Sequence, residues 1–246
     1  MTMCKQVLLF VVCGMSLPAH AGDDPGDEAV DQWLRDITME AAARDSWESG
    51  HGTDPHTITP LADMPAPAAV KAHFQRQIAA ANAGTVDVAA GSIPAVASLL
   101  RATPGRVLSE QALRKRLAVP PSRLEGTPLA NARLLDMDLQ GTHMGSKATG
   151  LTRTFLLDGV GVIQFGENSY RLDGTRILEI REALNTPIGA VRGALRSQRS
   201  ADGHGAATLT WVTPEKAFSL SLVTDDGASI ENGIALLIRI ARAIQP

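Results

Sequence analysis

The stretch TRTFLLDGVGVIQF (residues 152–165) decides the fold of this chain. It contains two short apolar runs, 152–157 and 160–165, which flank the dipeptide Asp158-Gly159. Asp-Gly between two such runs is the two-residue turn signal of a β-hairpin, because the turn that joins the strands requires positive φ angles. The sequence therefore predicts an antiparallel hairpin at this point.

Further strands are expected on both sides of this hairpin. Their predicted ranges are 132–139, 170–172, 176–180, 207–212 and 217–223. The last two runs flank Thr213-Pro214-Glu215-Lys216, which predicts a second hairpin.

Two helices are predicted among and after these strands. In 187–199 a proline stands at the first helical position, and Ile188, Val191 and Leu195 recur at helical spacing. In 230–244 a broad apolar face follows Ser229, a residue suited to cap the helix. A helix with so wide an apolar face is expected to pack across a sheet.

The first half of the chain is expected to be mainly helical. Helices are predicted over 29–47, 68–83, 93–101 and from Ser109 to Pro120. A Pro- and Gly-rich segment, 48–68, separates the first helix from the second and is the expected linker.

These elements predict an α+β fold in four parts: a signal peptide (1–21), an acidic leader with helix and linker (22–67), a helical segment (68–128) and an α+β domain (129–246). We expect an antiparallel sheet of about five strands in the last part. Helices should pack on one face of it, including the C-terminal amphipathic helix.

Residues 1–21 have the pattern of a secretory signal peptide. Lys5 precedes the apolar run 7–12, and Ala19-His20-Ala21 is a small-x-small cleavage site. Cleavage near Ala21 would place the mature chain in the periplasm or outside the cell, with no transmembrane segment. Lipid attachment at Cys13 is disfavoured because Val12 stands where a small residue is expected.

Composition limits the possible partners and chemistry. The whole chain has 23 basic and 26 acidic residues, so its net charge of −3 gives no electrostatic basis for nucleic-acid binding. Both cysteines, Cys4 and Cys13, lie in the predicted signal, so the mature chain would contain neither a disulfide nor a thiolate site. No motif indicates a cofactor.

Three arginines are the candidate partner-binding residues. If 187–199 is helical, Arg192, Arg196 and Arg199 form one basic ridge beside the apolar stripe. Guanidinium groups bind carboxylates well and are enriched at interfaces, although charged stripes are more often simply solvated.

The linker carries the candidate metal ligands. His51, Asp54 and His56 are the main ones, with Asp45 and Glu48 nearby. Imidazole and carboxylate groups suit zinc, but no paired spacing such as His-x3-His is present, so a polar linker is the favoured interpretation.

Catalytic motifs are weak. Residues 141–147 (GTHMGSK) lack the spacing of a phosphate loop and favour a hairpin turn. Asp136 begins a pattern similar to a calcium loop, but Lys147 stands at the twelfth position, so Asp136 and Asp138 are expected to face water on a strand. A hydrolase would draw first on His143 and Ser146 together with Asp136 or Asp138.

The sequence thus favours an exported periplasmic protein-binding module without catalytic activity, of accessory, chaperone-like or immunity (inhibitor) type. Its partner would be another envelope or exported protein. The alternatives are an envelope hydrolase with a dispersed active site, and a protein that binds a metal or small ligand.

Overall fold

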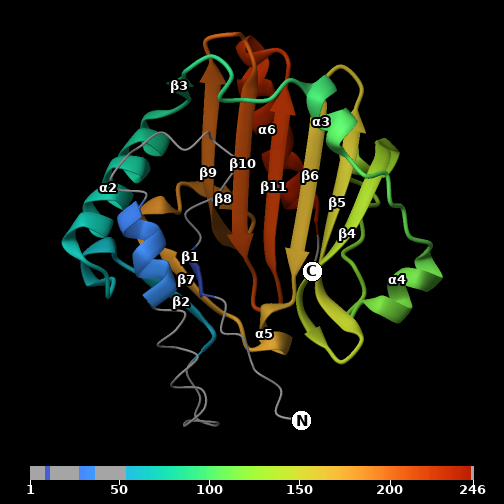
Figure 1. Cartoon of the computed structure of the whole chain (residues 1–246), viewed down its shortest axis with the longest axis horizontal. Helices are drawn as coiled ribbons and strands as arrows, with labels where there is room; N and C mark the ends of the chain where they lie inside the picture. Colours follow the sequence, from blue (N-terminus) through green and yellow to red (C-terminus); the bar gives the residue numbers. More distant parts are fainter. Residues whose placement is uncertain (1–8, 12–27, 37–53, 245–246) are drawn as a thin grey trace.

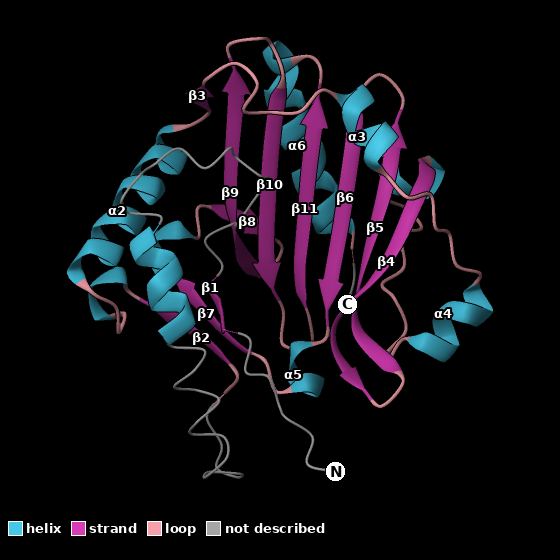
Figure 2. Cartoon of the chain, in the orientation of Figure 1, coloured by secondary structure: helices cyan, strands magenta, loops and turns pink. Residues whose placement is uncertain are grey.

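The computed structural model describes residues 9–11, 28–36 and 54–244. An eight-stranded sheet forms the centre of the molecule, and a three-stranded sheet lies at the lower left of Figure 1, below β8 and β9. Helices lie on both faces of the larger sheet (Figure 2). The chain is therefore α+β as predicted, with more strands than the five expected.

The larger sheet has the strand order β3-β9-β10-β11-β6-β5-β4, and the short strand β8 pairs with residues 191–193 at the start of β9. All its neighbours are antiparallel except the pair β3 and β9. The strands are β3 (Val86–Val88), β4 (Arg133–Met144), β5 (Lys147–Leu157), β6 (Gly161–Asn168), β8 (Thr186–Ile188), β9 (Val191–Ser200), β10 (Gly205–Val212) and β11 (Ala217–Thr224). Both predicted hairpins, β5–β6 and β10–β11, are confirmed, although the first closes through the three residues 158–160 and not through a two-residue turn.

The main core lies between this sheet and the helix α6 (Ile230–Ala243). Alternate residues of the central strands point toward α6, and Leu209 and Leu220 are fully buried there with Leu237 of the helix. Trp211 stacks on Phe218 with ring centroids 5.0 Å apart. The predicted C-terminal helix is confirmed, although the Ser229 hydroxyl donates to Asp226 Oδ2 (2.6 Å) and does not cap it.

The opposite face of the sheet is also partly covered, so the expectation of helices on one face only is wrong. Ile93 and the helix α3 (Val96–Ala102) pack on Ala206 and Val223, which point away from α6. The helix α2 (Ala68–Ala83) packs through Phe74 in a cluster that includes Ala194 of β9. The helical residues 28–36 join this cluster.

The smaller sheet is entirely parallel and has the order β1-β7-β2. Its strands are β1 (Leu9–Val11), β7 (Arg176–Ile180) and β2 (His56–Thr59). β1 belongs to the segment that the sequence marks as a signal peptide, and β2 belongs to the expected linker. β7 was expected to continue the antiparallel sheet and instead pairs with these two segments.

The helix predicted over 187–199 is wrong, because these residues form most of the hairpin β8–β9. Its turn contains Gly189, whose φ of +58° lies in the left-handed region. Gly193 lies where β9 pairs with both β8 and β10. A side chain does not fit there, because a Cβ would lie 2.6 Å from Thr210 O and 2.7 Å from Ile188 Cδ1. The glycines that the helix prediction tolerated are what allow the hairpin.

The remaining elements are short. They are α4 (Glu110–Arg116), α5 (Tyr170–Asp173), η1 (Leu61–Asp63), η2 (Pro128–Asn131), η3 (Arg181–Ala183) and η4 (Gly227–Ser229). Ser109 caps α4 by accepting from Ala112 N, as its position indicated. Residues 170–172, expected to be a strand, lie in the helical turn α5. Within the described parts of the chain, no helix is long and apolar enough to cross a membrane.

Candidate functional site

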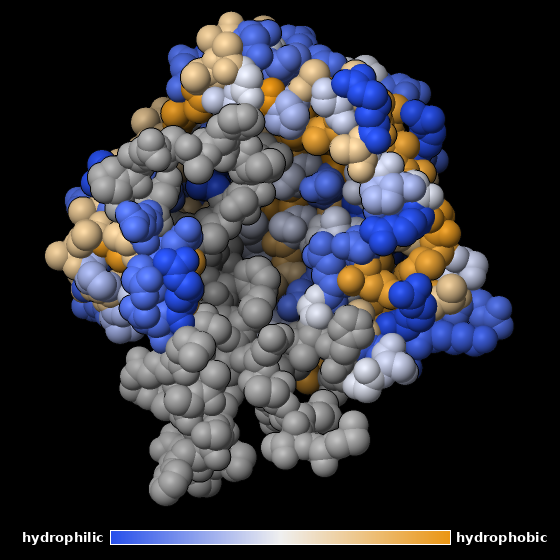
Figure 3. Space-filling view, in the orientation of Figure 1, coloured by the Kyte–Doolittle hydropathy of each residue, from blue (hydrophilic) through white to orange (hydrophobic). Residues whose placement is uncertain are grey.

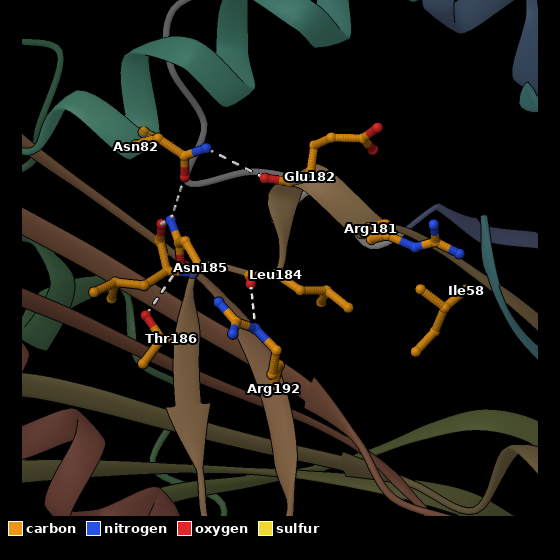
Figure 4. Close-up of a pocket in the computed structure, with 10 residues that line it drawn as sticks. Ile58, Asn82, Arg181, Glu182, Leu184, Asn185, Thr186 and Arg192 are labelled. Carbon is orange, nitrogen blue, oxygen red and sulfur yellow. Dashed lines mark hydrogen bonds between the residues drawn. The ribbon is translucent and has the colours of Figure 1, made fainter. Parts of the chain in front are cut away.

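A pocket of about 810 Å³ lies where α2, η3 and the hairpin β8–β9 meet β2. It is lined by Ile58, Ala81, Asn82, Arg181, Glu182, Leu184, Asn185, Thr186, Arg192 and Leu195. Figure 4 shows Leu184 near the centre, with Arg181 and Ile58 to one side, Asn82 and Glu182 above, and Arg192 below. Its volume is in the range of ligand-binding pockets.

Arg192 is held in place by one hydrogen bond. Its Nε donates to the carbonyl oxygen of Leu184 at 2.7 Å, at the point where η3 ends. The two terminal nitrogens of this exposed guanidinium have no hydrogen-bond partner among the described residues. Because Nε is fixed, the edge formed by these two nitrogens is oriented in advance for a bidentate contact with a carboxylate.

Asn185 fixes the inner wall of the pocket. Its amide pairs with the backbone of Leu195, donating to the carbonyl and accepting from the N–H, both at 2.9 Å. Its Nδ2 also donates to Asn82 Oδ1 (3.1 Å), and its Oδ1 accepts from Thr186 Oγ1 (3.0 Å). The amide thus ties the end of α2 to β9, and its hydrogen-bonding capacity is fully used.

The charge of the pocket is positive overall. Arg181 and Arg192 contribute two guanidinium groups, and Glu182 contributes one carboxylate, whose Oε2 accepts from Leu61 N at 2.9 Å. Arg181 is exposed, and its guanidinium group has no partner among the residues that the structure describes. The arrangement favours an acidic group over a basic one.

The structure does not assemble the predicted arginine ridge. On a strand, successive side chains point to opposite faces, so Arg192 and Arg196 share one face and Arg199 lies on the other. Arg199 Nε donates to Asp87 Oδ1 of β3 at 3.1 Å. Of the three arginines, only Arg192 lines the pocket.

The metal candidates face separate partners. His56 Nε2 lies 2.6 Å from Glu179 Oε2, and Asp54 Oδ1 accepts from Arg171 at 3.0 Å. His51, Asp45 and Glu48 lie outside the described residues. Within those residues no group of three His, Cys, Asp or Glu side chains is placed to hold a metal ion.

Three of the hydrolase candidates, Ser146, Asp136 and Asp138, lie on the hairpin formed by β4 and β5. Ser146 is exposed at the turn between β4 and β5, where the sequence predicted a hairpin turn. Asp136 is buried, which contradicts the expectation that it faces water, and its Oδ1 accepts from Arg106 N at 2.6 Å. Asp138 lies 3.4 Å from the Arg106 guanidinium. None of these residues lines the pocket.

A buried polar cluster, which the sequence did not reveal, joins the loop at Ser122 to the sheet. The Glu167 carboxylate accepts from Ser122 N and Oγ, from Arg153 (2.8 Å) and from Lys216 Nζ (2.7 Å). Burial lowers the pKa of Arg153, and the neighbouring Glu167 opposes this shift.

The cluster places Lys216 Nζ 3.1 Å from Ser122 Oγ, an arrangement that resembles a serine–lysine nucleophile pair. Lys216 Nζ, however, also donates to Glu167 Oε2 at 2.7 Å and to the carbonyl oxygen of Pro120 at 3.1 Å, so the amine is already engaged by two other acceptors. Ser122 is only 6% exposed. The cluster therefore has a structural role: it holds the loop at Ser122 against the sheet.

Sequence reasoning found Arg192 but missed Ile58, Asn82, Arg181 and Asn185. The signal available for Asn185 was its position before Thr186-Pro187, which was interpreted as a helix start. No local pattern marks the other three residues, because they meet only through the tertiary fold.

Comparisons of the chain with protein-family models, with curated proteins and with solved structures found no match.

Proposed function

We propose that this chain is an exported, non-catalytic protein-binding module of the bacterial envelope, and that the arginine-lined pocket is its binding site. The observation that carries the proposal is the oriented guanidinium of Arg192 with both terminal nitrogens free of described partners. Export rests on the signal pattern of residues 1–21. Accessory, chaperone-like and immunity-type roles all fit such a module.

The lining of the pocket favours a protein partner over a small molecule. Small-molecule sites are mostly apolar and enclose most of their ligand. Here the charged residues Arg181, Glu182 and Arg192 are all exposed. An acidic side chain presented by another protein would reach Arg192, while Ile58 and the edge of Leu184 offer apolar contact around it.

The experiment is a capture of partners by the processed protein, carrying a C-terminal tag, from an envelope extract of its own host. We expect one stoichiometric partner, read by mass spectrometry. Arg192→Ala should weaken its binding by roughly 10-fold or more, because a charge-assisted bidentate contact is lost.

Arg199→Ala is the matched control, since it removes the same side chain from the same strand at a distance from the pocket. It should leave capture unchanged. Capture that is equal in the wild type and in Arg192→Ala would contradict the pocket as the binding site. Full loss in Arg199→Ala as well would point to a different surface.

A further inference from the structure

The outer edge of β7 has an unusual occupant. The structure pairs Arg176, Ile177 and Leu178 in parallel register with Leu9, Phe10 and Val11. These three residues are part of the apolar run of the expected signal peptide. Figure 1 shows the short strand β1 at the side of β7 opposite β2.

Removal of the signal would leave this edge without its strand. Ile177 N donates to Pro55 O at 2.7 Å, so the backbone groups of Ile177 point toward β2. The N–H and C=O of one residue leave a strand on the same side, and the side alternates along the chain. The backbone groups of Arg176 and Leu178 therefore point toward β1 and would be unpaired in the processed protein.

An open edge of this kind accepts an extended chain segment by strand addition. The segment that the structure places there shows what fits: three consecutive apolar residues running parallel to β7. The other edge of β7 is already covered by β2, so the new strand has only one place to add.

We infer that the processed protein binds an extended apolar segment of its partner as a parallel strand on β7, in the position of β1. This surface is separate from the arginine-lined pocket, which none of residues 176–178 lines. The inference rests on the proposed export and binding function, because only cleavage near Ala21 frees the edge. Main-chain hydrogen bonds to β7 would supply most of the affinity for this segment, and its apolar side chains would add to it.

The test uses the protein processed by its own host and a labelled peptide with the sequence of residues 5–12, KQVLLFVV. Fluorescence anisotropy measures the affinity. Mass spectrometry of the intact protein first establishes whether residues 1–21 have been removed. We expect a processed chain and saturable peptide binding. A chain that retains these residues would overturn the inference, because β7 would then never be open.

Backbone methylation of the peptide supplies the decisive comparison without any change to the protein. Phe10 stands opposite Ile177, so the register directs its N–H at β7, and N-methylation there should weaken binding about 10-fold or more. N-methylation at Leu9, whose N–H points away from β7, is the matched control and should change the affinity less than about 3-fold.

Equal loss at both positions would overturn strand addition in this register, and absence of binding by the unmodified peptide would overturn the edge as a site. Neither result depends on Arg192, so a failure here is distinct from a failure of the pocket, which the capture experiment tests by itself.

Discussion

Tyr170 is the single tyrosine of the chain, and its position makes it a reporter of the contact between α5 and the β10–β11 turn. The residue is fully buried, and its hydroxyl donates to Thr213 O at 3.0 Å and to Pro214 O at 3.2 Å. Burial raises the pKa of the phenol above its ordinary value, and the nearby Arg171 opposes the shift. The protonated phenol is therefore the form that the fold favours.

This shift predicts the behaviour of the protein in alkali. A pKa raised in the folded state contributes stability that is fully present below the unfolded pKa of about 10 and is lost as the pH rises through the folded value. Absorbance at 295 nm should show a single phenol step above that of the urea-unfolded chain. A step at the same pH in both states would mean that Tyr170 is solvated.

Two features of the fold were predicted correctly from short stretches of sequence. Ser109 caps α4 and Asp158-Gly159 turns the β5–β6 hairpin. In each case the determining interaction is made within a few residues along the chain. The sequence was therefore sufficient to predict them.

At the scale of elements, α6 is the main support of the large sheet. Leu237 is fully buried at its centre, in the cluster that contains Leu209 and Leu220. Leu237→Ala should lower the free energy of unfolding by roughly 2–5 kcal/mol, because it removes buried methyl groups and leaves a cavity. Urea unfolding followed by circular dichroism measures this change.

Arg239→Ala is the control on the same helix, since Arg239 is exposed on the opposite face. We expect a change within about 0.5 kcal/mol. Similar losses in the two variants would show that α6 does not pack on the sheet through the face containing Leu237.

The element that the sequence misassigned, β8–β9, shows why periodicity alone was insufficient. Ile188, Val191 and Leu195 fit a helical stripe, yet the segment is a hairpin whose second strand pairs along its length with β10. That partner lies downstream in the sequence and is invisible to a local pattern. Gly189 and Gly193 were the contrary signals, since glycine is unfavourable inside a helix.

The smaller sheet was not predicted for the same reason, because its strands pair over an even longer distance along the chain. β7 pairs with β2, more than a hundred residues earlier in the chain, and Ile58 stands opposite Glu179. Neither strand is long enough to give a clear alternation, and β2 falls in a segment rich in proline and glycine. Its composition predicted a linker, whereas its tertiary contacts make it a strand.

At the scale of the whole molecule, the candidate site joins residues from three distant parts of the sequence. Ile58 comes from β2, Asn82 from the end of α2, and Arg192 from β9. The sequence singled out Arg192 for its chemistry but placed it on a helix beside Arg199. The pocket itself depends on the packing of α2 against η3 and β9, which local patterns do not encode.

The most direct test of the binding pocket is site-specific photocrosslinking in the living host. Benzoylphenylalanine replaces Ile58, an exposed apolar residue of the pocket lining, and, as the control, replaces Val107, which is similarly exposed but lies outside the lining. We predict a discrete adduct with one partner protein from position 58, abolished by Arg192→Ala and absent from position 107. The same adduct from both positions, or none from position 58, would contradict the pocket as the site of partner binding.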